Sequence, residues 1–386
     1  MIEENGRKQK GRKTGYILAV FGCLAVLSLA MCLGHVLYSW LSEADRENQQ
    51  ALAALHIQGE AMGTELESEA ETEHDEEELP LEQDSKEELY SEEEVNLMIA
   101  QAREEAGVAA REALVTELQI SLENGSTVVE ALRGCFTDRL VLASSGKYYF
   151  LPIRTDLSHN SYIEENLRLL ENGELEYVEK EEVVSHKGID VSKFQGRIDW
   201  DKVAADGVEF AIIRVGYRGY GENGTLAEDE TFEANIKGAL AAGIRTGVYF
   251  YSQALNEEEL MEEAQLVLEK IAPYEITGPV VYDVEKTAGD GRMNSLSVEE
   301  RTRLTKLFCE TMKEAGYRPM IYHNMEMALL MLDLTQLKEY DKWFAYYNPE
   351  LYYPYEYTMW QYTDKGTVNG IEGEVDLNIS FVPWED

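Results

Sequence analysis

The stretch of sequence that decides the fold is GPVVYDVEK, residues Gly278 to Lys286. Its first half is apolar enough to form a buried strand, yet two carboxylates follow directly, at Asp283 and Glu285. Side chains two positions apart in a strand point to the same face. Asp283 and Glu285 are therefore predicted to project together beyond the strand, with Val284 turned to the opposite face.

The sequence on both sides of this stretch alternates apolar strands with helical patterns. Strand-like segments include FAIIRVGYR and RTGVYFYSQA, and the helix after the quoted stretch begins at Ser297 and Glu300, which match a capping box. The last strands, KWFAYYN, YTMWQYT and VDLNISF, come without good helices between them. Strands interleaved with helices indicate a parallel sheet that is covered on its outside. Residues 187–386 are predicted to form an α/β domain, a TIM-like (β/α) barrel with a helix-poor C-terminal half.

Carboxylates fall where such a barrel places its chemistry, at the carboxyl ends of the strands. Asp190 ends the first predicted strand, Asp283 and Glu285 the fourth, and Asp376 lies on the last. Crowded carboxylates push their pKa values apart, so that one can stay protonated near neutral pH while others remain anionic. Glycoside hydrolysis needs such an acid for the leaving oxygen and an anion for the oxocarbenium-like centre.

Other readings of these acids are weaker. A bare D-x-E is a weak signal, but its place after an apolar strand strengthens it, because unpaired buried acids are costly. Carboxylates also suit Mg²⁺ or Ca²⁺, yet the sequence has neither an HExxH motif nor an EF-hand loop, and we expect no metal or other cofactor. The segment Gly219–Gly224 matches GxGxxG, but nearby acids would repel a pyrophosphate, so a loop is predicted there.

Aromatic residues at or near strand ends are candidates for binding sugar. An aromatic ring offers an apolar face to a sugar, and tyrosine adds a hydroxyl group. Because the chain has 23 Tyr, many of them must be ordinary packing residues. The candidates are Tyr217, Tyr220, Tyr249, Tyr251, Tyr322, Tyr346, Tyr347 and Trp360.

Several of these motifs together resemble glycoside hydrolase family 25, the lysozyme-type N-acetylmuramidases of bacteria and phages. The resemblance is carried by GIDVSKFQG, PVVYDVE, MWQYT and VDLN in the family's order, over residues 187–384. It implies cleavage of the β-1,4 bond after N-acetylmuramic acid in peptidoglycan, with retained anomeric configuration. Tyr282 stands where many relatives carry a small or aliphatic residue, and a packing change without loss of activity is expected there.

The resemblance also assigns roles by position. Glu285 matches the general acid/base, and Asp283 matches the partner carboxylate, which either attacks the anomeric carbon or steadies the acetamido group of the substrate. Asp190 and Asp376 match two further acids that line the site. The WQY motif adds Gln361, so that the predicted substrate-binding set is Tyr249, Tyr251, Tyr322, Tyr347, Trp360 and Gln361.

The amino-terminal end predicts a membrane anchor. A basic tail, residues 1–13, precedes the charge-free run 14–42, which exceeds the about 20 apolar residues that span a bilayer. The alternative is a cleaved signal peptide, whose apolar region is typically ~7–15 residues long. The charges place the N-terminus in the cytoplasm and everything past residue 42 outside, at the cell wall.

The segments between anchor and barrel are predicted from composition. The chain carries 74 Asp+Glu against 34 Lys+Arg, a net charge of −40, which argues against nucleic acid as a partner. Residues 43–94 are predicted to be an acidic linker, and 95–124 an amphipathic helix. Its stripe over 95–118 would serve self-association in a coiled coil or docking, and both stay open. Residues 125–186 are predicted to be a small α+β domain, with a polar helix at 163–170 and a turn at Asn172-Gly173.

The hypothesis from sequence is a membrane-anchored peptidoglycan hydrolase. A second hypothesis is a catalytically silent, wall-binding scaffold, and a third is a barrel glycosidase that acts on another polymer such as chitin. Cys135 and Cys309 fall in different segments and do not indicate a disulfide framework, and Cys309 is expected to be a buried free thiol.

Overall fold

The computed structural model describes residues 90–221, 223–287, 289 and 291–384. The predicted basic tail 1–13, the predicted transmembrane segment 14–42 and the predicted linker up to residue 89 lie outside the described residues. Among the helices that are described, none combines the length and the apolar character that crossing a bilayer requires. The residues from Ser91 onward form one compact unit.

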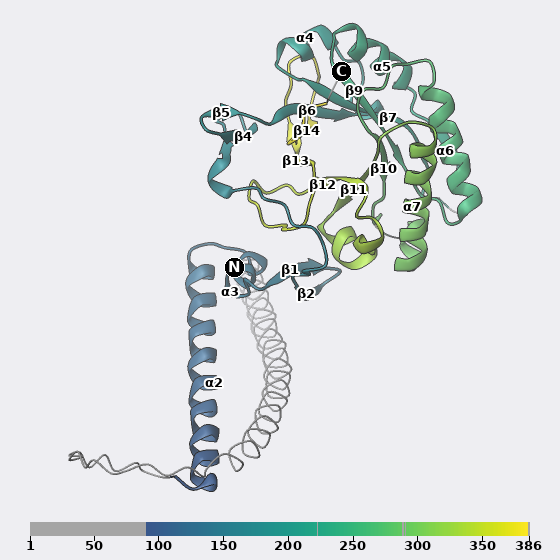
Figure 1. The fold of residues 1–386 in the computed structure, drawn as a ribbon. Coiled ribbons are helices and arrows are strands. Elements are labelled where there is room, and N and C mark those ends of the chain that lie inside the picture. Colours follow the sequence, from purple (N-terminus) through teal and green to yellow (C-terminus); the bar gives the residue numbers. More distant parts are fainter. Residues whose placement is uncertain (1–89, 222, 288, 290, 385–386) are drawn as a thin grey trace, which may run out of the picture. The chain divides into compact units, whose positions relative to one another are not determined.

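The core of this unit is a closed barrel built from a nine-stranded sheet (Figure 1). Neighbouring strands pair in the order β6-β14-β13-β12-β11-β10-β9-β7, and β6 also pairs with β7, which closes the barrel. The short strand β8 (Leu226–Glu228) pairs antiparallel with β7. The closing strands are β6 (His186–Val191), β7 (Phe210–Arg218), β9 (Arg245–Tyr251), β10 (Val280–Asp283), β11 (Pro319–Asn324), β12 (Asp341–Ala345), β13 (Met359–Gly366) and β14 (Val375–Ser380).

The last strand departs from the predicted parallel arrangement. Strand β14 runs antiparallel to both of its neighbours, β13 and β6. A parallel crossover takes about a dozen or more residues, and the connection here, residues 367–374, is shorter than that. The prediction of a barrel was confirmed, and that of a wholly parallel sheet was wrong. Because β14 is reversed, Asp376 lies at the start of its strand and still reaches the rim where the other strands end, paired in register with Asp190.

Four helices follow strands in the first half of the barrel and cover its outside (Figure 1). The predicted capping box of the last of these, α7, is half formed: Ser297 accepts from the Glu300 amide, but the Glu300 carboxylate turns to Arg303. Between β11 and residue 384, where the description ends, the helices are the short turns η4 (Met327–Met331) and η5 (Leu334–Gln336), in agreement with the helix-poor prediction. The four covering helices are α4 (Trp200–Ala205), α5 (Phe232–Ala241), α6 (Glu257–Ile271) and α7 (Val298–Glu314).

The residues before the barrel form helices and two small antiparallel sheets. Helix α2 (Glu92–Glu123) has Leu118 as its buried residue, so the choice between a coiled coil and a docked helix stays open. The predicted helix at 163–170 was wrong: a single 3₁₀ turn leads into strand β3, which pairs with β4 around Gly173 (φ 82°). The turn Asn172-Gly173 favours a hairpin over a helix. The other elements are α3 (Val128–Cys135), η1 (Glu164–Asn166), β1 (Arg139–Ser144), β2 (Lys147–Pro152), β3 (Leu167–Leu169), β4 (Leu175–Glu179) and β5 (Glu182–Val183).

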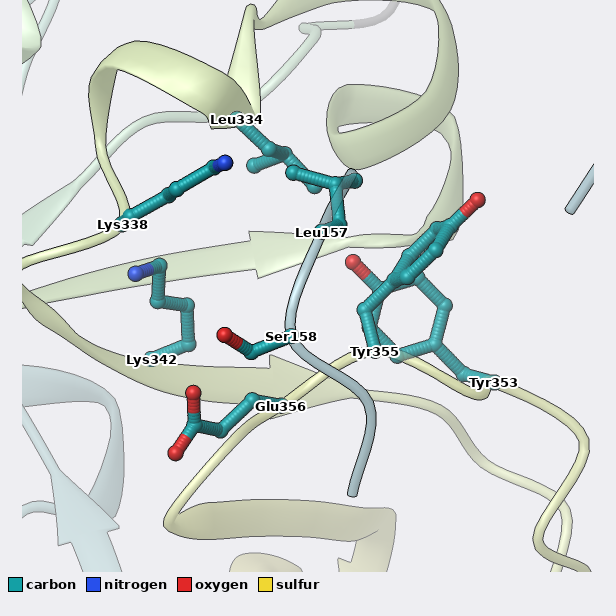
Figure 2. A pocket seen from close by; sticks show the side chains of 8 residues that line it. All are labelled: Leu157, Ser158, Leu334, Lys338, Lys342, Tyr353, Tyr355 and Glu356. Atoms are coloured by element: carbon teal, nitrogen blue, oxygen red, sulfur yellow. The ribbon is translucent and has the colours of Figure 1, made fainter. Parts of the chain in front are cut away.

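An extended segment of this region covers the side of the barrel that lacks helices. His159 forms a bridge with Tyr355 in the long loop between β12 and β13, and the Asn160 amide donates to the carbonyl oxygen of Pro354 at 2.9 Å. Figure 2 shows the junction, where Leu157 and Ser158 lie over a cavity of about 30 Å³. Burial in this junction lowers the pKa of Lys342 to about 8. The segment therefore takes the place of a missing helix layer.

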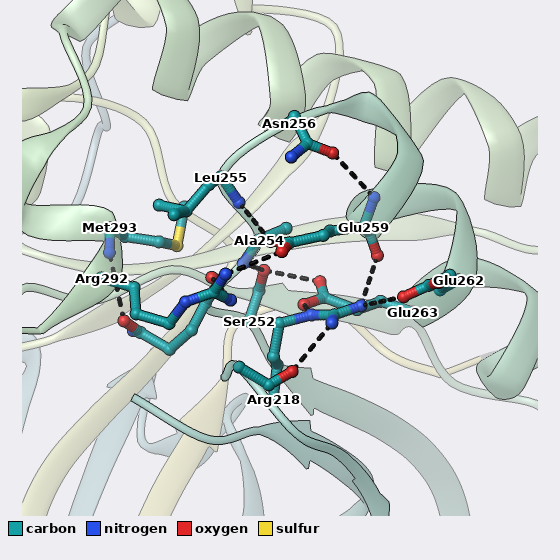
Figure 3. Close-up of polar contacts among 12 residues, drawn as sticks. Arg218, Ser252, Ala254, Leu255, Asn256, Glu259, Glu262, Glu263, Arg292 and Met293 are labelled. Atoms are coloured by element: carbon teal, nitrogen blue, oxygen red, sulfur yellow. Dashed lines mark hydrogen bonds and ion pairs between the residues drawn. The ribbon is translucent and has the colours of Figure 1, made fainter. Parts of the chain in front are cut away.

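A buried ion-pair network links helix α6 to the ends of strands β7, β9 and β10 (Figure 3). Arg218 on β7 donates through Nε to Glu263 of α6 at 2.7 Å. The Glu263 carboxylate also accepts from the Ser252 hydroxyl at 2.6 Å, and the Ser252 amide donates to the carbonyl oxygen of Asp283 at 3.0 Å. Burial raises the pKa of Glu263 to about 7, against the opposing effects of Ser252 and Arg218. The network thus links α6 to the last residue of β10.

Replacing Arg218 by Met is expected to lower the free energy of unfolding by about 3–5 kcal/mol, because Glu263 would stay buried without its cation. Urea denaturation measures this loss. The double variant Arg218→Met/Glu263→Gln, which removes the orphaned charge, should regain most of the lost stability. A loss below about 1 kcal/mol in the single variant would show that the ion pair is dispensable.

Candidate active site

A cavity of about 230 Å³ opens where the barrel strands end. All four acids singled out from the sequence line it, although they come from three strand regions that are far apart in the chain. Aromatic and polar side chains complete the wall, as expected for a site that binds a sugar polymer. The lining residues are Asp190, Ser192, Phe194, Gln195, Arg214, Tyr249, Tyr251, Asp283, Glu285, Tyr322, Trp343, Tyr347, Gln361 and Asp376.

Asp190 is held in one orientation by two amides. Its Oδ2 accepts from Nε2 of Gln361 and from Nδ2 of Asn378, both at 2.8 Å. Burial raises the pKa of Asp190 to about 6, with the two amide hydrogen bonds opposing the rise and the charge of Glu285 adding to it. Asp190 is therefore a fixed acceptor whose charge depends on its neighbours.

Asp376 faces Asp190 across the β14–β6 pairing. Burial raises the pKa of Asp376 to about 8, and the charges of Asp190 and Asp364 add to the rise. Two carboxylates this close cannot both ionise cheaply. Asp376 therefore keeps its proton more readily than Asp190 does.

Asp283 and Glu285 complete the cluster. Asp283 is the last residue of β10 and is buried, and among the described residues its Oδ1 has no hydrogen-bond partner. Burial, then the charges of Glu285 and Asp190, raise the pKa of Asp283, while Arg214 opposes them. Burial also raises the pKa of Glu285, against the opposing effect of the nearby Tyr322 hydroxyl group and with help from the charge of Asp376. Burial and crowding therefore favour the protonated forms of these acids more than water does.

Arg214 brings a buried positive charge to these acids. It projects from β7, donates through Nε to Oδ2 of Asp229 at 2.7 Å, and lies 5.1 Å from the ring centroid of Phe194. Sequence reasoning missed this residue. The signal was the charge itself: an arginine in the middle of the largely apolar strand FAIIRVGYR must find a partner when it is buried. Its position lets it stabilise the anionic form of Asp283.

Within the part of the chain that the structure describes, no group of three or more His, Cys, Asp or Glu side chains is arranged to hold a metal ion. The paired acids instead match the requirement of glycoside hydrolysis, one proton donor and one anion.

The comparisons with known proteins agree with this geometry. Residues 189–371 match the family model described as Glycosyl hydrolases family 25. Protein YegX of Escherichia coli K12, whose name marks it as uncharacterized, is 30% identical over 204 residues, which cover 50% of this chain and 68% of that protein. The chain belongs to glycosyl hydrolases family 25.

Two further comparisons match half of the chain or more. The autolytic lysozyme of Clostridium acetobutylicum is 28% identical over 195 residues, 50% of this chain and 55% of that lysozyme. The chain thus spans about half the length of this relative. The solved structure of the modular autolysin LytC from Streptococcus pneumoniae, in complex with a synthetic peptidoglycan ligand, has a TM-score of 0.46 and 28% identity, covering 62% of this chain and 51% of that one.

Most residues of the predicted substrate-binding set line the cavity of the family 25 domain. The hydroxyl groups of Tyr322 and Tyr347 both donate to Oε1 of Gln361, at 2.7 and 2.9 Å. Gln361 thereby links two tyrosines to Asp190. Tyr249 and Tyr251 lie on the opposite part of the wall, on β9.

Trp360 does not reach the cavity, and its prediction as a sugar-binding residue is corrected. It is 1% exposed, and its Nε1 donates to the carbonyl oxygen of Tyr346 at 2.8 Å. Adjacent residues of a strand point to opposite faces. Because Gln361 faces the cavity, Trp360 must face the outer layer, where it packs near Tyr357. The same alternation turns Tyr282 outward onto Phe308 of α7, as predicted.

The pair Trp360 and Gln361 offers a test of this assignment. Gln361→Ala is expected to lower kcat/KM by about 10–100-fold, because it frees Asp190 and two tyrosines at once. Trp360→Phe should lower the melting temperature and leave kcat/KM of the folded enzyme within about twofold, since it removes packing and the hydrogen bond to the Tyr346 carbonyl, neither of which lies in the cavity. The reverse pattern, measured by kinetics and thermal unfolding, would contradict the assignment.

Other cavity residues were also missed from the sequence. Ser192 and Gln195 belong to a capped 3₁₀ turn after β6, and Phe194 between them is 77% exposed. Trp343 is buried beneath Tyr322 and donates to Asn378 at 2.8 Å. Short turns after strands leave no periodic signal in sequence, so only the motif GIDVSKFQG marked this place. The segment Gly219–Gly224 is a loop, as predicted, in its described residues.

Proposed function

We propose that this chain is a membrane-anchored peptidoglycan hydrolase that cleaves the β-1,4 bond between N-acetylmuramic acid and N-acetylglucosamine with retention. One observation carries the proposal: four carboxylates from three distant parts of the chain line one cavity. In addition, burial raises the pKa of Glu285, as a general acid requires. Membership in family 25 supports the same reaction class.

In the proposed mechanism Glu285 is the general acid. It transfers its proton to the glycosidic oxygen as the bond to the anomeric carbon breaks. Asp283, whose anion is favoured by Arg214, either attacks the anomeric carbon or steadies the substrate's acetamido group as it attacks. Ionised Glu285 then takes a proton from the incoming water, whose oxygen bonds to the anomeric carbon and displaces the oxygen of Asp283 or of the acetamido group. This step restores the acid and releases the new reducing end.

Asp190 and Asp376 support this step electrostatically. Their negative charge, shared across the β14–β6 pairing, disfavours ionisation of Glu285 before substrate arrives. Tyr347 is half exposed and lines the cavity, so its ring is the proposed stacking surface for a sugar.

The proposed setting is the outer side of a cell membrane. The apolar run 14–42 would anchor the chain, with the N-terminus in the cytoplasm, and the acidic linker 43–94 would set how far the enzyme reaches into the wall. A tethered hydrolase cuts only within that reach. Deleting residues 1–42 should move the protein from the membrane fraction to the soluble fraction, and retention in the membrane would contradict the anchor.

Product analysis tests the proposed activity. Purified full-length chain is incubated in parallel with peptidoglycan and with chitin, and the new reducing ends are identified by mass spectrometry. We expect reducing ends on N-acetylmuramic acid from peptidoglycan. Binding to peptidoglycan without new ends would instead support a wall-binding scaffold, and cleavage of chitin alone would support a glycosidase of another polymer.

A further inference from the structure

We propose that the β1–β2 hairpin, which lies outside the family-matched residues 189–371, positions the proton donor. Its turn, Ser144-Ser145-Gly146, holds the side chain of Lys286, and Lys286 directly follows Glu285 in the chain. Ser145 and Lys286 would thus be positioning residues for the reaction. The inference rests on the proposed function, because it assigns Glu285 the role of acid.

The contacts of Lys286 join three separate parts of the chain. Its Nζ lies 3.0 Å from the Ser145 hydroxyl, 3.5 Å from the Ser144 hydroxyl and 2.5 Å from Oε1 of Glu326, which follows β11. Ser144 is buried and also donates to Glu326. Hydrogen bonds that involve charged groups are stronger than neutral ones. This cluster therefore ties the loop after β10 to both the hairpin and β11.

Glu285 depends on such a tie because it lies past the end of its strand. Strand β10 ends at Asp283, and the Ser252 amide donates to the Asp283 carbonyl at that point. On the far side, the Thr287 amide donates to Oδ1 of Asn294 at 3.1 Å. Between these two hydrogen bonds, the side chain of Lys286 contacts Ser145 of the hairpin and so restrains the segment that carries Glu285. A misplacement of about 1 Å at a catalytic group can cost about 100-fold in rate.

The presence of serine at position 145 of the turn supports a role in holding Lys286, beyond folding of the hairpin. Ser144 pairs with Lys147, so the hairpin loop is Ser145-Gly146, with φ values of 49° and 74°. A two-residue turn with both φ values positive favours Asn, Asp or Gly at its first position. Serine there carries a conformational cost. The hydroxyl group that it supplies is the one that Lys286 contacts.

A second contact from the residues before the barrel reaches another part of the cavity wall. Arg133 of α3 donates through Nη1 to the hydroxyl of Tyr346 at 2.6 Å, and its guanidinium lies 4.0 Å from the ring centroid of Tyr352. Tyr346 directly precedes Tyr347, which lines the cavity. The residues before the barrel thus contact Lys286 and Tyr346, which are the sequence neighbours of the cavity residues Glu285 and Tyr347.

The hairpin β4–β5 provides a matched control. Its turn, Lys180-Glu181, also has positive φ values, 50° and 71°, and both residues are exposed. Glycine relieves a left-handed residue in either turn without adding atoms. Ser145→Gly removes a contact to Lys286, whereas Glu181→Gly removes none that reaches the cavity.

The experiment compares four variants of the full chain on peptidoglycan. Lys286→Met is expected to lower kcat by about 10–100-fold with KM within about threefold, because substrate still binds but the acid is misplaced. Lys286→Arg should restore most of kcat, since it keeps the charge. Ser145→Gly should lower kcat by about three- to tenfold without lowering the melting temperature. Glu181→Gly should change neither quantity.

Amide hydrogen exchange at residues 284–287 gives a readout that does not need turnover. We expect faster exchange there in Lys286→Met and Ser145→Gly than in Glu181→Gly or the unaltered chain. If the unaltered chain does not hydrolyse peptidoglycan, the proposed function fails, and exchange alone then decides whether the hairpin orders this segment. Values of kcat within twofold of the unaltered chain, or unchanged exchange, would overturn the inference.

Discussion

Replacing Glu285 by Gln is expected to lower kcat on peptidoglycan by about 10²–10⁴-fold, the usual contribution of a general acid. The amide has nearly the same shape as the carboxyl group, but it has no acidic proton to give to the glycosidic oxygen. The loss should therefore fall on kcat, with little change in binding. Release of reducing ends from peptidoglycan, measured under single-turnover conditions, reports the chemical step.

Stability and leaving-group dependence provide the controls for this variant. Glu285 is a carboxylate crowded by Asp376 and enclosed by the cavity, so its neutral replacement should fold with an unchanged or higher melting temperature. A substrate whose leaving group needs no protonation should be cleaved with a much smaller loss. Retention of more than a tenth of kcat on peptidoglycan would remove Glu285 from the role of acid.

Replacing Asp283 by Asn is expected to abolish turnover and to stabilise the fold at the same time. Turnover should fall by about 10²–10⁴-fold, because the amide supplies no negative charge to the oxocarbenium-like centre. Stability should rise by about 1–2 kcal/mol near pH 8. Asp283 is buried beside two other acids, and among the described residues its Oδ1 lacks a hydrogen-bond partner. Urea denaturation and single-turnover kinetics measure the two effects.

The stabilisation by Asp283→Asn should depend on pH in a defined direction. The folded state raises the pKa of Asp283 above its ordinary value of 3.8, so folding favours the protonated form. Its contribution to stability is fully present below pH 3.8 and is lost as the pH rises through the folded pKa. The advantage of Asn should therefore be near zero at pH 3.5 and grow toward pH 8. A variant that is less stable than the parent at pH 8 would contradict this account.

The parts of the fold that follow from local pattern were predictable. Apolar strands that end in carboxylates, together with the barrel rule that places chemistry at strand ends, predict Asp190, Asp283 and Glu285 at one rim. Period-two alternation also predicted the outward side of Tyr282. The same rule, applied to Trp360 and Gln361, would have shown that only one of the two can face the cavity.

The parts that depend on long-range pairing were not predictable. The reversal of β14 follows from a short connection, and Asp376 reached the rim only because of it. The docking of the β1–β2 hairpin onto Lys286 joins residues about 140 positions apart, and no local propensity encodes such a contact. Polar contacts between segments that are distant in the chain therefore cannot be predicted from a single sequence.

The pH dependence of kcat/KM on peptidoglycan tests most directly whether the crowded acids keep Glu285 protonated. Burial raises the pKa of Glu285 above its ordinary value of 4.5. Because the protonated form acts, activity should persist above pH 4.5 and fall on the alkaline side, with an apparent midpoint above that value. An activity that is already lost as the pH rises through 4.5 would show that the cavity does not hold the proton, and would contradict the account.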